Sequence, residues 1–368
     1  MPARSLCGGP LGGARAILVI RHRAAGDLLL TTPALRALRA ALPAARIDVL
    51  VSRGLGSLLE GNPDVTRAIE FDRKSLRSQI ALYLKLARGG YDAAIDLVSN
   101  PRSAWMAAIT RARVRAGTDI PGRSWAYTVS VPREHEGARG GAPRYAPEAA
   151  LALLRALGVS DRGLHLTLQV SPRAEQVVEG WLRAEGIAAG PLLACLPAGS
   201  WPSKTWIPER FARAMDALAS DGAGEVVWLW GPGERALAES CRALMRSPSR
   251  LAPAMGWQEL AALLRRSALL VANDSGPKHV AVALGVPTVT VFGPTHPGTW
   301  HPPDGPHIVV EATGLECLHC NANVCPLPGD RHMRCMRDVT EDRVVEAARA
   351  LLGGSGFGAE GRTPCASR

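Results

Sequence analysis

The stretch from Ala16 to Ala41, AILVIRHRAAGDLLLTTPALRALRAA, decides the fold that we expect. Its first five residues are apolar and mostly branched, which predicts a buried strand, and the segment from Ala34 has the spacing of an amphipathic helix. Further strands are predicted at Arg46–Val51 and Asp92–Val98. This alternation of strands and helices indicates a parallel sheet with right-handed crossovers.

The second half of the chain repeats this alternation after a loop at 131–147 and helices predicted at 148–157 and 174–185. The apolar runs that predict its strands are 191–196, 225–230, 268–272 and 288–292, with a helix at 257–266 and a terminal helix at 339–352. We therefore predict an α/β protein with two doubly wound domains, residues 1–168 and 169–352, and a flexible tail over 353–368.

Composition narrows the class of protein. The 368 residues are 47% hydrophobic and 21% charged, which is typical of a soluble globular chain and excludes extensive disorder. No apolar run reaches the length of a membrane-spanning helix, and the first residues lack the apolar core of a signal peptide. The net charge of +10 favours anionic partners. Only four of the basic residues are lysines: Lys74, Lys85, Lys204 and Lys278.

A first motif, RHRAAGDLLLTTP, follows the first predicted strand. Gly26 is suited to a strained turn, and Asp27 then stands at the start of a helix. Two interpretations remain open for Asp27. It is either a first-turn acid that complements the helix dipole, or a carboxylate at the mouth of a cleft that acts as a general base.

Two further motifs follow strands of the second half. PAGSWPSKTW is a loop of small residues that lets backbone N–H groups approach a ligand, and Lys204 supplies a point charge suited to phosphate, although the P-loop spacing is absent. In NDSGPKHVAVALGVP, Asp274 or Ser275 is a candidate helix cap and Gly285 a candidate helix end. The same helix start, with its free N–H groups, is also a candidate anion site.

Four cysteines cluster near the C-terminus with the spacing Cys317-x2-Cys320-x4-Cys325-x9-Cys335. Four thiolates at this spacing suit a closed structural zinc site, and reduced free thiols are the alternative. Either state indicates a cytosolic protein. The chain has no GxSxG or HExxH motif, and no GxGxxG follows the first strand.

Together these motifs resemble glycosyltransferase family 9, the heptosyltransferases of lipopolysaccharide core synthesis, over about residues 16–352. The resemblance implies the GT-B fold, in which two Rossmann-like domains face each other across a cleft. It implies that the N-terminal domain binds the acceptor and the C-terminal domain binds the nucleotide-sugar. It also implies inverting transfer without a catalytic metal. The chain differs from the family pattern at His22-Arg23, close to the expected acceptor.

The resemblance also implies residue roles. Asp27 would be the general base, and Lys204 would hold the donor diphosphate. The remaining donor-binding residues would be Ser200, Glu234, Asp274, Ser275, Gly276 and His279, and Arg102 would face the acceptor. The implied partners are a nucleotide-sugar, with ADP-heptose as the expected donor, and a lipid-linked glycan at the inner membrane surface. No nucleic acid is expected, and the enzyme would be cytoplasmic or peripheral on the inner face of the cytoplasmic membrane.

Two other functions stay open at this point. A nucleotide-sugar 2-epimerase shares the GT-B layout and acts without any acceptor. A basic nucleic-acid-binding module would explain the net charge, although the arginines between Arg102 and Arg123 lack a recognition-helix pattern.

Overall fold

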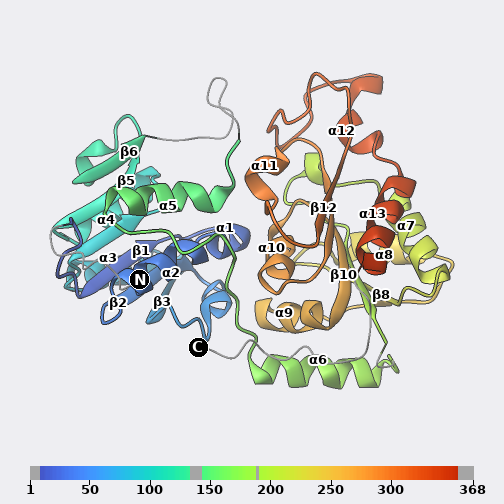
Figure 1. The fold of residues 1–368 in the computed structure, drawn as a ribbon, viewed down its shortest axis with the longest axis horizontal. Coiled ribbons are helices and arrows are strands. Elements are labelled where there is room, and N and C mark those ends of the chain that lie inside the picture. The colour runs from blue at the N-terminus through green and yellow to red at the C-terminus, as the bar shows by residue number, and fades with distance from the viewer. Residues whose placement is uncertain (1–8, 133–142, 188–189, 355–368) are drawn as a thin grey trace.

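The computed structural model describes residues 9–132, 143–187 and 190–354. They form two lobes, each built on a six-stranded parallel sheet between layers of helices (Figure 1). The doubly wound α/β architecture predicted from the sequence is therefore confirmed. No helix in these described ranges is long and apolar enough to cross a membrane.

The N-terminal sheet has the order β3-β2-β1-β4-β5-β6. Its strands are β1 (Ala16–Ile20), β2 (Arg46–Ser52), β3 (Arg67–Phe71), β4 (Ala93–Asp96), β5 (Val114–Asp119) and β6 (Val129–Pro132). One face is covered by α2 (Thr32–Ala41) and α5 (Ala146–Ala156), and the other by α3 (Leu76–Ala87) and α4 (Pro101–Ile109). The short elements are α1 (Ala25–Leu29), η1 (Gly56–Leu59) and η2 (Ser124–Ala126).

The C-terminal sheet repeats this topology with the order β12-β11-β10-β7-β8-β9. Its strands are β7 (Leu192–Leu196), β8 (Glu225–Trp228), β9 (Ser249–Leu251), β10 (Ser267–Asn273), β11 (Thr288–Phe292) and β12 (His307–Glu311). Its helices are α6 (Pro172–Ala184), α7 (Pro208–Ser220), α8 (Arg235–Ala243), α9 (Trp257–Arg266), α10 (Gly276–Ala283), α11 (Pro297–Trp300), α12 (Arg334–Arg337) and α13 (Glu341–Gly354), with short turns η3 (Pro202–Lys204) and η4 (Gly329–Arg331).

The strands that the sequence predicts are those buried on both faces. β1, β7, β10 and β11 are buried at every residue, so an unbroken apolar run marks each of them. The sequence does not predict β3, β5, β6, β9 and β12. These strands lie away from the centre of each sheet, and exposed or half-buried residues interrupt their apolar runs. The predicted loop at 131–147 lies partly outside the described residues, as does most of the predicted tail.

The two lobes are joined by apolar packing and by one buried amide. Leu28 and Leu29 of α1 belong to the same buried apolar cluster as Val280 and Ala281 of α10, and the two helices contact each other. Gln258 of α9 donates to the carbonyls of Ser57 (2.6 Å) and Gln169 (3.1 Å), and accepts from the N–H of Ser171 (2.8 Å). These contacts hold α1 against the start of the C-terminal domain's α10.

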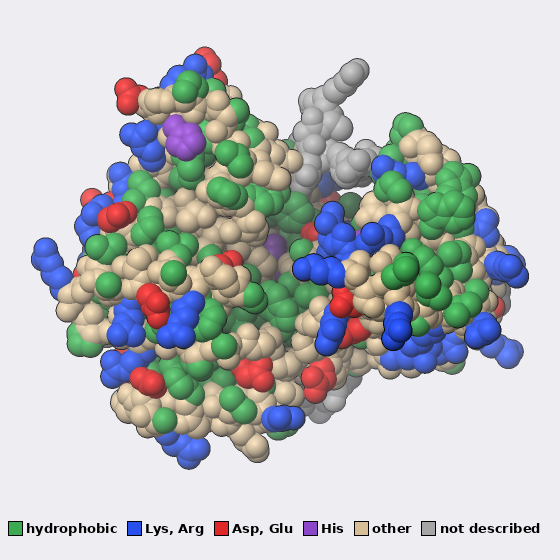
Figure 2. Space-filling model, turned by 180° about the vertical axis from the view of Figure 1, so that it is seen from behind, with side chains coloured by type: hydrophobic (Ala, Val, Ile, Leu, Met, Phe, Trp, Pro, Cys, Tyr) green, Lys and Arg blue, Asp and Glu red, His purple; other side chains and the backbone are tan. Residues whose placement is uncertain are grey.

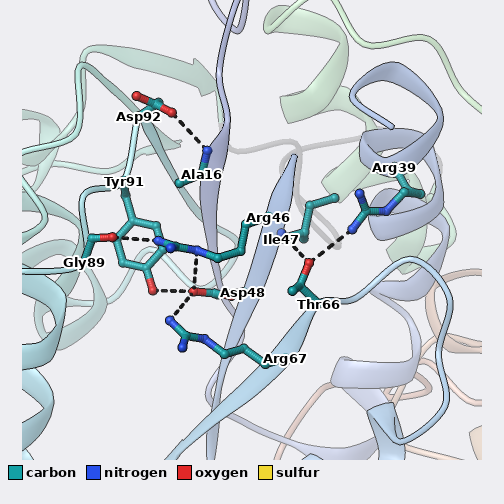
Figure 3. A network of polar contacts seen from close by, with 10 residues as sticks. All are labelled: Ala16, Arg39, Arg46, Ile47, Asp48, Thr66, Arg67, Gly89, Tyr91 and Asp92. Atoms are coloured by element: carbon teal, nitrogen blue, oxygen red, sulfur yellow. Dashed lines mark hydrogen bonds and ion pairs between the residues drawn. The ribbon is translucent and has the colours of Figure 1, made fainter. Parts of the chain in front are cut away.

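A buried carboxylate organises the amino edge of the N-terminal sheet (Figure 3). Asp48 of β2 is fully buried, and its Oδ2 accepts from Arg67 Nη2 (2.8 Å) and from the Tyr91 hydroxyl (2.8 Å). Arg46 Nε lies 3.4 Å from the same oxygen. Burial, and next the hydrogen bond to Asp48, raise the pKa of Tyr91 to about 12. This network fixes the strand starts and leaves the opposite, carboxyl edge to the functional site.

We predict that Asp48→Asn lowers the free energy of unfolding by about 1–3 kcal/mol, because it removes the charge on which Arg67 and Tyr91 converge. Asp161→Asn is the matched control, since its ion pair with Arg155 is largely exposed, and we expect a loss of about 0–1 kcal/mol there. Denaturant unfolding of both variants measures the difference. Equal losses for the two variants would contradict the structural role of Asp48.

Candidate functional site

The predicted motifs gather at the switch points of the two sheets. In each sheet the strand order reverses between two central strands, β1 and β4 in one and β7 and β10 in the other. Ligands of open α/β sheets bind beside such points, outside the carboxyl ends of the strands. Residues 21–27 follow β1, 197–206 follow β7, and 274–279 follow β10. The molecular surface is hollowed between the two lobes (Figure 2).

At Gly26 the backbone of the N-terminal domain packs closely against the C-terminal domain. A Cβ at this position would lie 2.7 Å from Cδ2 of His279, across the domain boundary. Gly26 lies inside α1 and does not have a positive φ, so the expected strained turn is wrong. The glycine is required by the close packing of α1, the helix that carries Asp27, on the start of α10.

Asp27 stands at the third position of α1, as the first-turn interpretation expects, and its role as a general base stays a prediction. Its Oδ2 accepts the N–H of Ala24 (3.1 Å), as expected of a first-turn acid. Its Oδ1 lies 3.2 Å from Nη2 of Arg21, and its side chain is 28% exposed. Arg21 orients the carboxylate through this ion pair, and the exposed part of the side chain can be reached by a ligand.

Asp274 forms the buried centre of the second half-site. Its Oδ2 accepts from Lys204 Nζ (2.7 Å) and from Thr295 Oγ1 (2.9 Å), and its Oδ1 accepts from Lys278 Nζ (2.7 Å). Burial alone would raise the pKa of Asp274, but the ammonium groups of Lys278 and Lys204 hold it well below its usual range. One carboxylate and two ammonium groups leave one positive charge in excess beside the start of α10.

Lys278 and Lys204 differ in exposure and in the groups that their ammonium nitrogens contact. Lys278 is fully buried and also donates to the carbonyl of Trp300 (2.9 Å), so its bonds lie within the fold. Lys204 is slightly exposed, with its Nζ 4.3 Å from the ring centre of Trp201. Lys204 is therefore the cation that can face a ligand, and Lys278 holds Asp274 in position.

The start of α10 has no side-chain cap, so the expectation that Asp274 or Ser275 caps this helix is wrong. Asp274 is occupied by the lysines. Ser275 Oγ and His279 Nδ1 are buried without a hydrogen-bond partner. Burial, and next the charge of Lys278, hold the pKa of His279 well below its usual value, so the imidazole is neutral. An uncapped helix start with unpartnered polar atoms is a suitable place for an anion.

Asn273 ties the β7 loop to this helix. Its Nδ2 donates to the carbonyl of Pro197 (2.7 Å), and its Oδ1 accepts the N–H of Trp206 (3.1 Å). A Cβ on Gly199 would lie 2.7 Å from the carbonyl carbon of Lys204, so the loop requires a glycine there. These contacts fix the Lys204 backbone, while Ser200 stands exposed in the same loop.

Comparison with known proteins shows which family the chain belongs to. The model of glycosyltransferase family 9 (heptosyltransferase) matches residues 80–329, more than half of the chain. The chain belongs to this family. It is therefore a glycosyltransferase, and the resemblance seen in the sequence is confirmed.

Its relatives support this assignment over nearly the whole length. Lipopolysaccharide heptosyltransferase 3 of Escherichia coli is 29% identical over 75% of this chain and 83% of that protein. Lipopolysaccharide heptosyltransferase 1 of Pseudomonas aeruginosa is 27% identical over 91% of this chain and 98% of that protein. A family 9 glycosyltransferase from Veillonella parvula has a similar crystal structure, with a TM-score of 0.81, 26% identity and coverage of 93% and 98%. The fold is GT-B, as predicted.

Two residues of this glycosyltransferase that the sequence interpretation missed are Arg21 and Thr295. Arg21 pairs with Asp27, and Thr295 follows β11 and bonds to Asp274. Arg21 stands directly after β1, and Thr295 lies three residues after the end of β11; a position just beyond the carboxyl end of a buried strand is the signal that would have identified them. Glu234, in contrast, lies in the β8–α8 loop, where its carboxylate accepts the N–H of Gly231 (2.8 Å). Its expected role near a ribose stays a prediction.

The C-terminal cysteines lie in one segment around α12. Burial, and next the neighbouring thiols of Cys320, Cys317 and Cys325, raise the pKa of Cys335 to about 11. His319 of this segment lies 2.8 Å from Glu311 instead. Within the described ranges no three His, Cys, Asp or Glu side chains converge as metal ligands do. The zinc site stays a prediction, and Cys7 and Cys365 lie outside the described residues.

Proposed function

We propose that this glycosyltransferase moves heptose from ADP-heptose to a lipopolysaccharide-core-type glycan, with inversion and without a catalytic metal. The observation that carries the proposal is the juxtaposition of two half-sites. Asp27 comes from one domain, and Lys204 with the uncapped α10 start comes from the other, with Gly26 packed against His279 between them. A base and an anion site on opposite sides are what glycosyl transfer from a nucleoside diphosphate sugar requires.

The donor side of the proposal rests on charge. A diphosphate that leaves the anomeric carbon gains negative charge, and preorganised donors in a buried site stabilise that charge best. Lys204 and the N–H groups at Ser275 and Gly276 are the donors we assign, with Ser275 Oγ and His279 as further hydrogen-bond partners. The Escherichia coli and Pseudomonas aeruginosa relatives named above are lipopolysaccharide heptosyltransferases, and an Escherichia coli heptosyltransferase of the same fold was solved with ADP. This supports ADP-heptose as the donor.

The acceptor side of the proposal rests on an arginine cluster at the carboxyl edge of the N-terminal sheet. Burial, and next the charges of Arg73, Arg23 and Arg102, lower the pKa of the buried His22 to about 4. The same neighbours, Arg23 and Arg102, act on Arg73. Three guanidinium groups whose charges act on the same buried histidine, five residues before Asp27 in the chain, favour an acceptor with carboxylate or phosphate groups. An anionic core glycan meets this requirement.

In the proposed reaction, an acceptor hydroxyl attacks the anomeric carbon as Asp27 takes its proton. The bond between that carbon and the diphosphate breaks, and the electron pair leaves with ADP. Arg21 keeps Asp27 oriented, and Asp274 keeps Lys204 oriented, so the charges are in place before the bond breaks. The site needs no metal in this scheme, because Lys204 and the helix N–H groups take the position that a cation would have.

The direct test is a transfer assay with purified enzyme, ADP-heptose and a heptose-deficient core acceptor, in the presence of EDTA. We expect ADP and an elongated glycan to form in equal amounts, and only when both substrates are present. Product from the nucleotide-sugar alone would indicate epimerase activity instead. Displacement of the nucleotide-sugar by DNA or RNA in a salt-dependent manner would favour nucleic-acid binding.

We predict that Asp27→Asn lowers kcat by about 10²–10⁴ while the affinity for ADP changes little, because the amide keeps the hydrogen bond to Ala24 but accepts no proton. Glu148→Gln is a matched control, since Glu148 is also a first-turn acid, on α5. Single-turnover kinetics and calorimetry separate the two effects. Wild-type turnover in Asp27→Asn would reduce Asp27 to a helix-capping residue.

We predict that Lys204→Ala weakens ADP binding and slows transfer, and that Lys204→Arg restores only part of both. Lysine acts as a point charge on the diphosphate, whereas the planar fork of arginine demands a different geometry beside Asp274. Affinity for the acceptor should stay the same. Calorimetry with ADP and with acceptor measures both, and an unchanged ADP affinity in Lys204→Ala would remove this loop from the donor site.

We also propose that the cysteine cluster holds one structural zinc, which would require its thiols to draw closer together. Four thiols within twenty residues supply the ligand set of a closed tetrahedral site. The ligands we assign are Cys317, Cys320, Cys325 and Cys335. Metal analysis of protein purified without chelator should find one zinc per chain, and Cys320→Ser should lose it. Protein without zinc at this ratio would have free thiols there.

A further inference from the structure

An apolar stripe runs along the outer side of α3 in the N-terminal domain. Leu76, Ile80 and Leu84 are spaced four residues apart, so they lie on one face of the helix. They are 70%, 51% and 49% exposed, while Leu82 and Leu86 on the other side of the helix pack under the sheet. Large side chains this exposed, in a row, indicate a surface that meets an apolar partner.

Two tryptophans extend the stripe onto the neighbouring elements. Trp105 of α4 and Trp125 of η2 are 57% and 52% exposed, and their rings lie edge to face with centroids 4.7 Å apart. α4 contacts both α3 and η2, so the pair belongs to the same side of the domain. We call these five residues the apolar face. Most of the large hydrophobic side chains that the described chain exposes belong to it.

Basic residues are concentrated along the α3 side of the apolar face. Residues 73–88 hold five basic residues and no acidic one: Arg73, Lys74, Arg77, Lys85 and Arg88. The acids between residues 73 and 118 are Asp92 and Asp96 alone, and the exposed Asp119 accepts from Ser124 of η2 (2.8 Å). Asp96 is fully buried, and Asp92 accepts the backbone N–H groups of Arg15 and Ala16 at the far edge of the sheet. In Figure 2 the N-terminal lobe, on the right, carries a broad hydrophobic area bordered by Lys and Arg.

The apolar face begins at the acceptor end of the site. Arg73 and Arg102, whose charges act on His22, stand just before α3 and at the start of α4. Leu76 follows Arg73 by three residues. A partner that covers the face therefore reaches the carboxyl edge of the N-terminal sheet, where Asp27 lies.

We propose that α3, α4 and η2 form a docking surface for an anionic phospholipid bilayer. Leu76, Ile80, Leu84, Trp105 and Trp125 would enter the headgroup region, and the nearby Lys and Arg would bind lipid phosphates. The docking proposal rests on the proposed function in one respect: docking would bring a lipid-linked acceptor to Asp27. Exposed Leu and Trp beside basic residues are the composition of an interfacial membrane surface, whose binding combines apolar burial with attraction to anionic lipid.

The test is co-sedimentation of the full chain with vesicles of phosphatidylcholine, with or without phosphatidylglycerol, in the absence of donor and acceptor. We expect binding to the anionic vesicles that weakens as salt rises. The variant Leu76→Gln/Ile80→Gln/Leu84→Gln should bind at least about tenfold less, since three apolar side chains no longer enter the bilayer. Lys74→Gln/Lys85→Gln should lose part of the preference for anionic lipid.

The matched control is Val177→Gln/Leu244→Gln, which alters two equally exposed apolar residues on the C-terminal domain. It should bind vesicles like the wild type. All substituted side chains are exposed, so thermal unfolding should confirm that each variant folds. The triple variant should also transfer heptose to a delipidated acceptor at the wild-type rate, which separates docking from chemistry.

Unchanged vesicle binding in the triple variant, or no binding by the wild type, would overturn the docking surface. So would light scattering that shows a wild-type dimer which the triple variant converts to monomer, because a second copy would then cover the face. Vesicle binding that depends on the stripe, in a protein that fails to transfer heptose, would leave the surface standing and reject the proposed function.

Discussion

The arrangement of the site depends on one buried carboxylate between two ammonium groups. Asp274 is nearly inaccessible to solvent, and a lone charge there would be costly; Lys204 and Lys278 make it tolerable by direct hydrogen bonds. The same hydrogen bonds also restrain the lysines. They hold Lys204 at the rim of α10, so that a flexible side chain becomes a fixed positive charge. Because Thr295 binds the same carboxylate, the loop after β11 is positioned by this group as well.

The close packing at the domain boundary depends on a residue without a side chain. Gly26 lets α1 pack against His279, and a larger residue would require the His279 ring or the backbone to shift. Leu28 and Leu29 reinforce this contact through the apolar cluster that reaches α10. The helix that carries Asp27 is thus packed against the helix whose start we assign to the diphosphate. A base in one domain and an anion site in the other can act on one pair of substrates only if this distance is fixed.

The sequence predicts what depends on burial and chain order. β1 and β11 were located to the residue because both faces of each strand are covered, so their apolar runs are unbroken. The same reasoning fails for β3 and β9, where exposed residues interrupt the pattern. Site positions after the central strands could be predicted, since topology places every such loop at one edge. Pairings could not. Nothing local indicates that Asp274 binds Lys204, seventy residues away, in place of capping its own helix.

Lysine usage connects the site with the apolar face. In a chain that otherwise uses arginine, Lys204 and Lys278 meet at Asp274, and Lys74 and Lys85 border the stripe on α3. The chemistry differs in the two places. An ammonium group fits between a carboxylate oxygen and the Trp300 carbonyl, where a planar guanidinium would need more width. At a surface, the long alkyl stem of lysine lies along apolar neighbours while its charge reaches outward. Arg73 and Arg102, in contrast, are the residues that we assign to the acceptor, for which planar recognition of carboxylate or phosphate would be an advantage. The choice of cation at each position therefore follows the geometry of the anion that it meets.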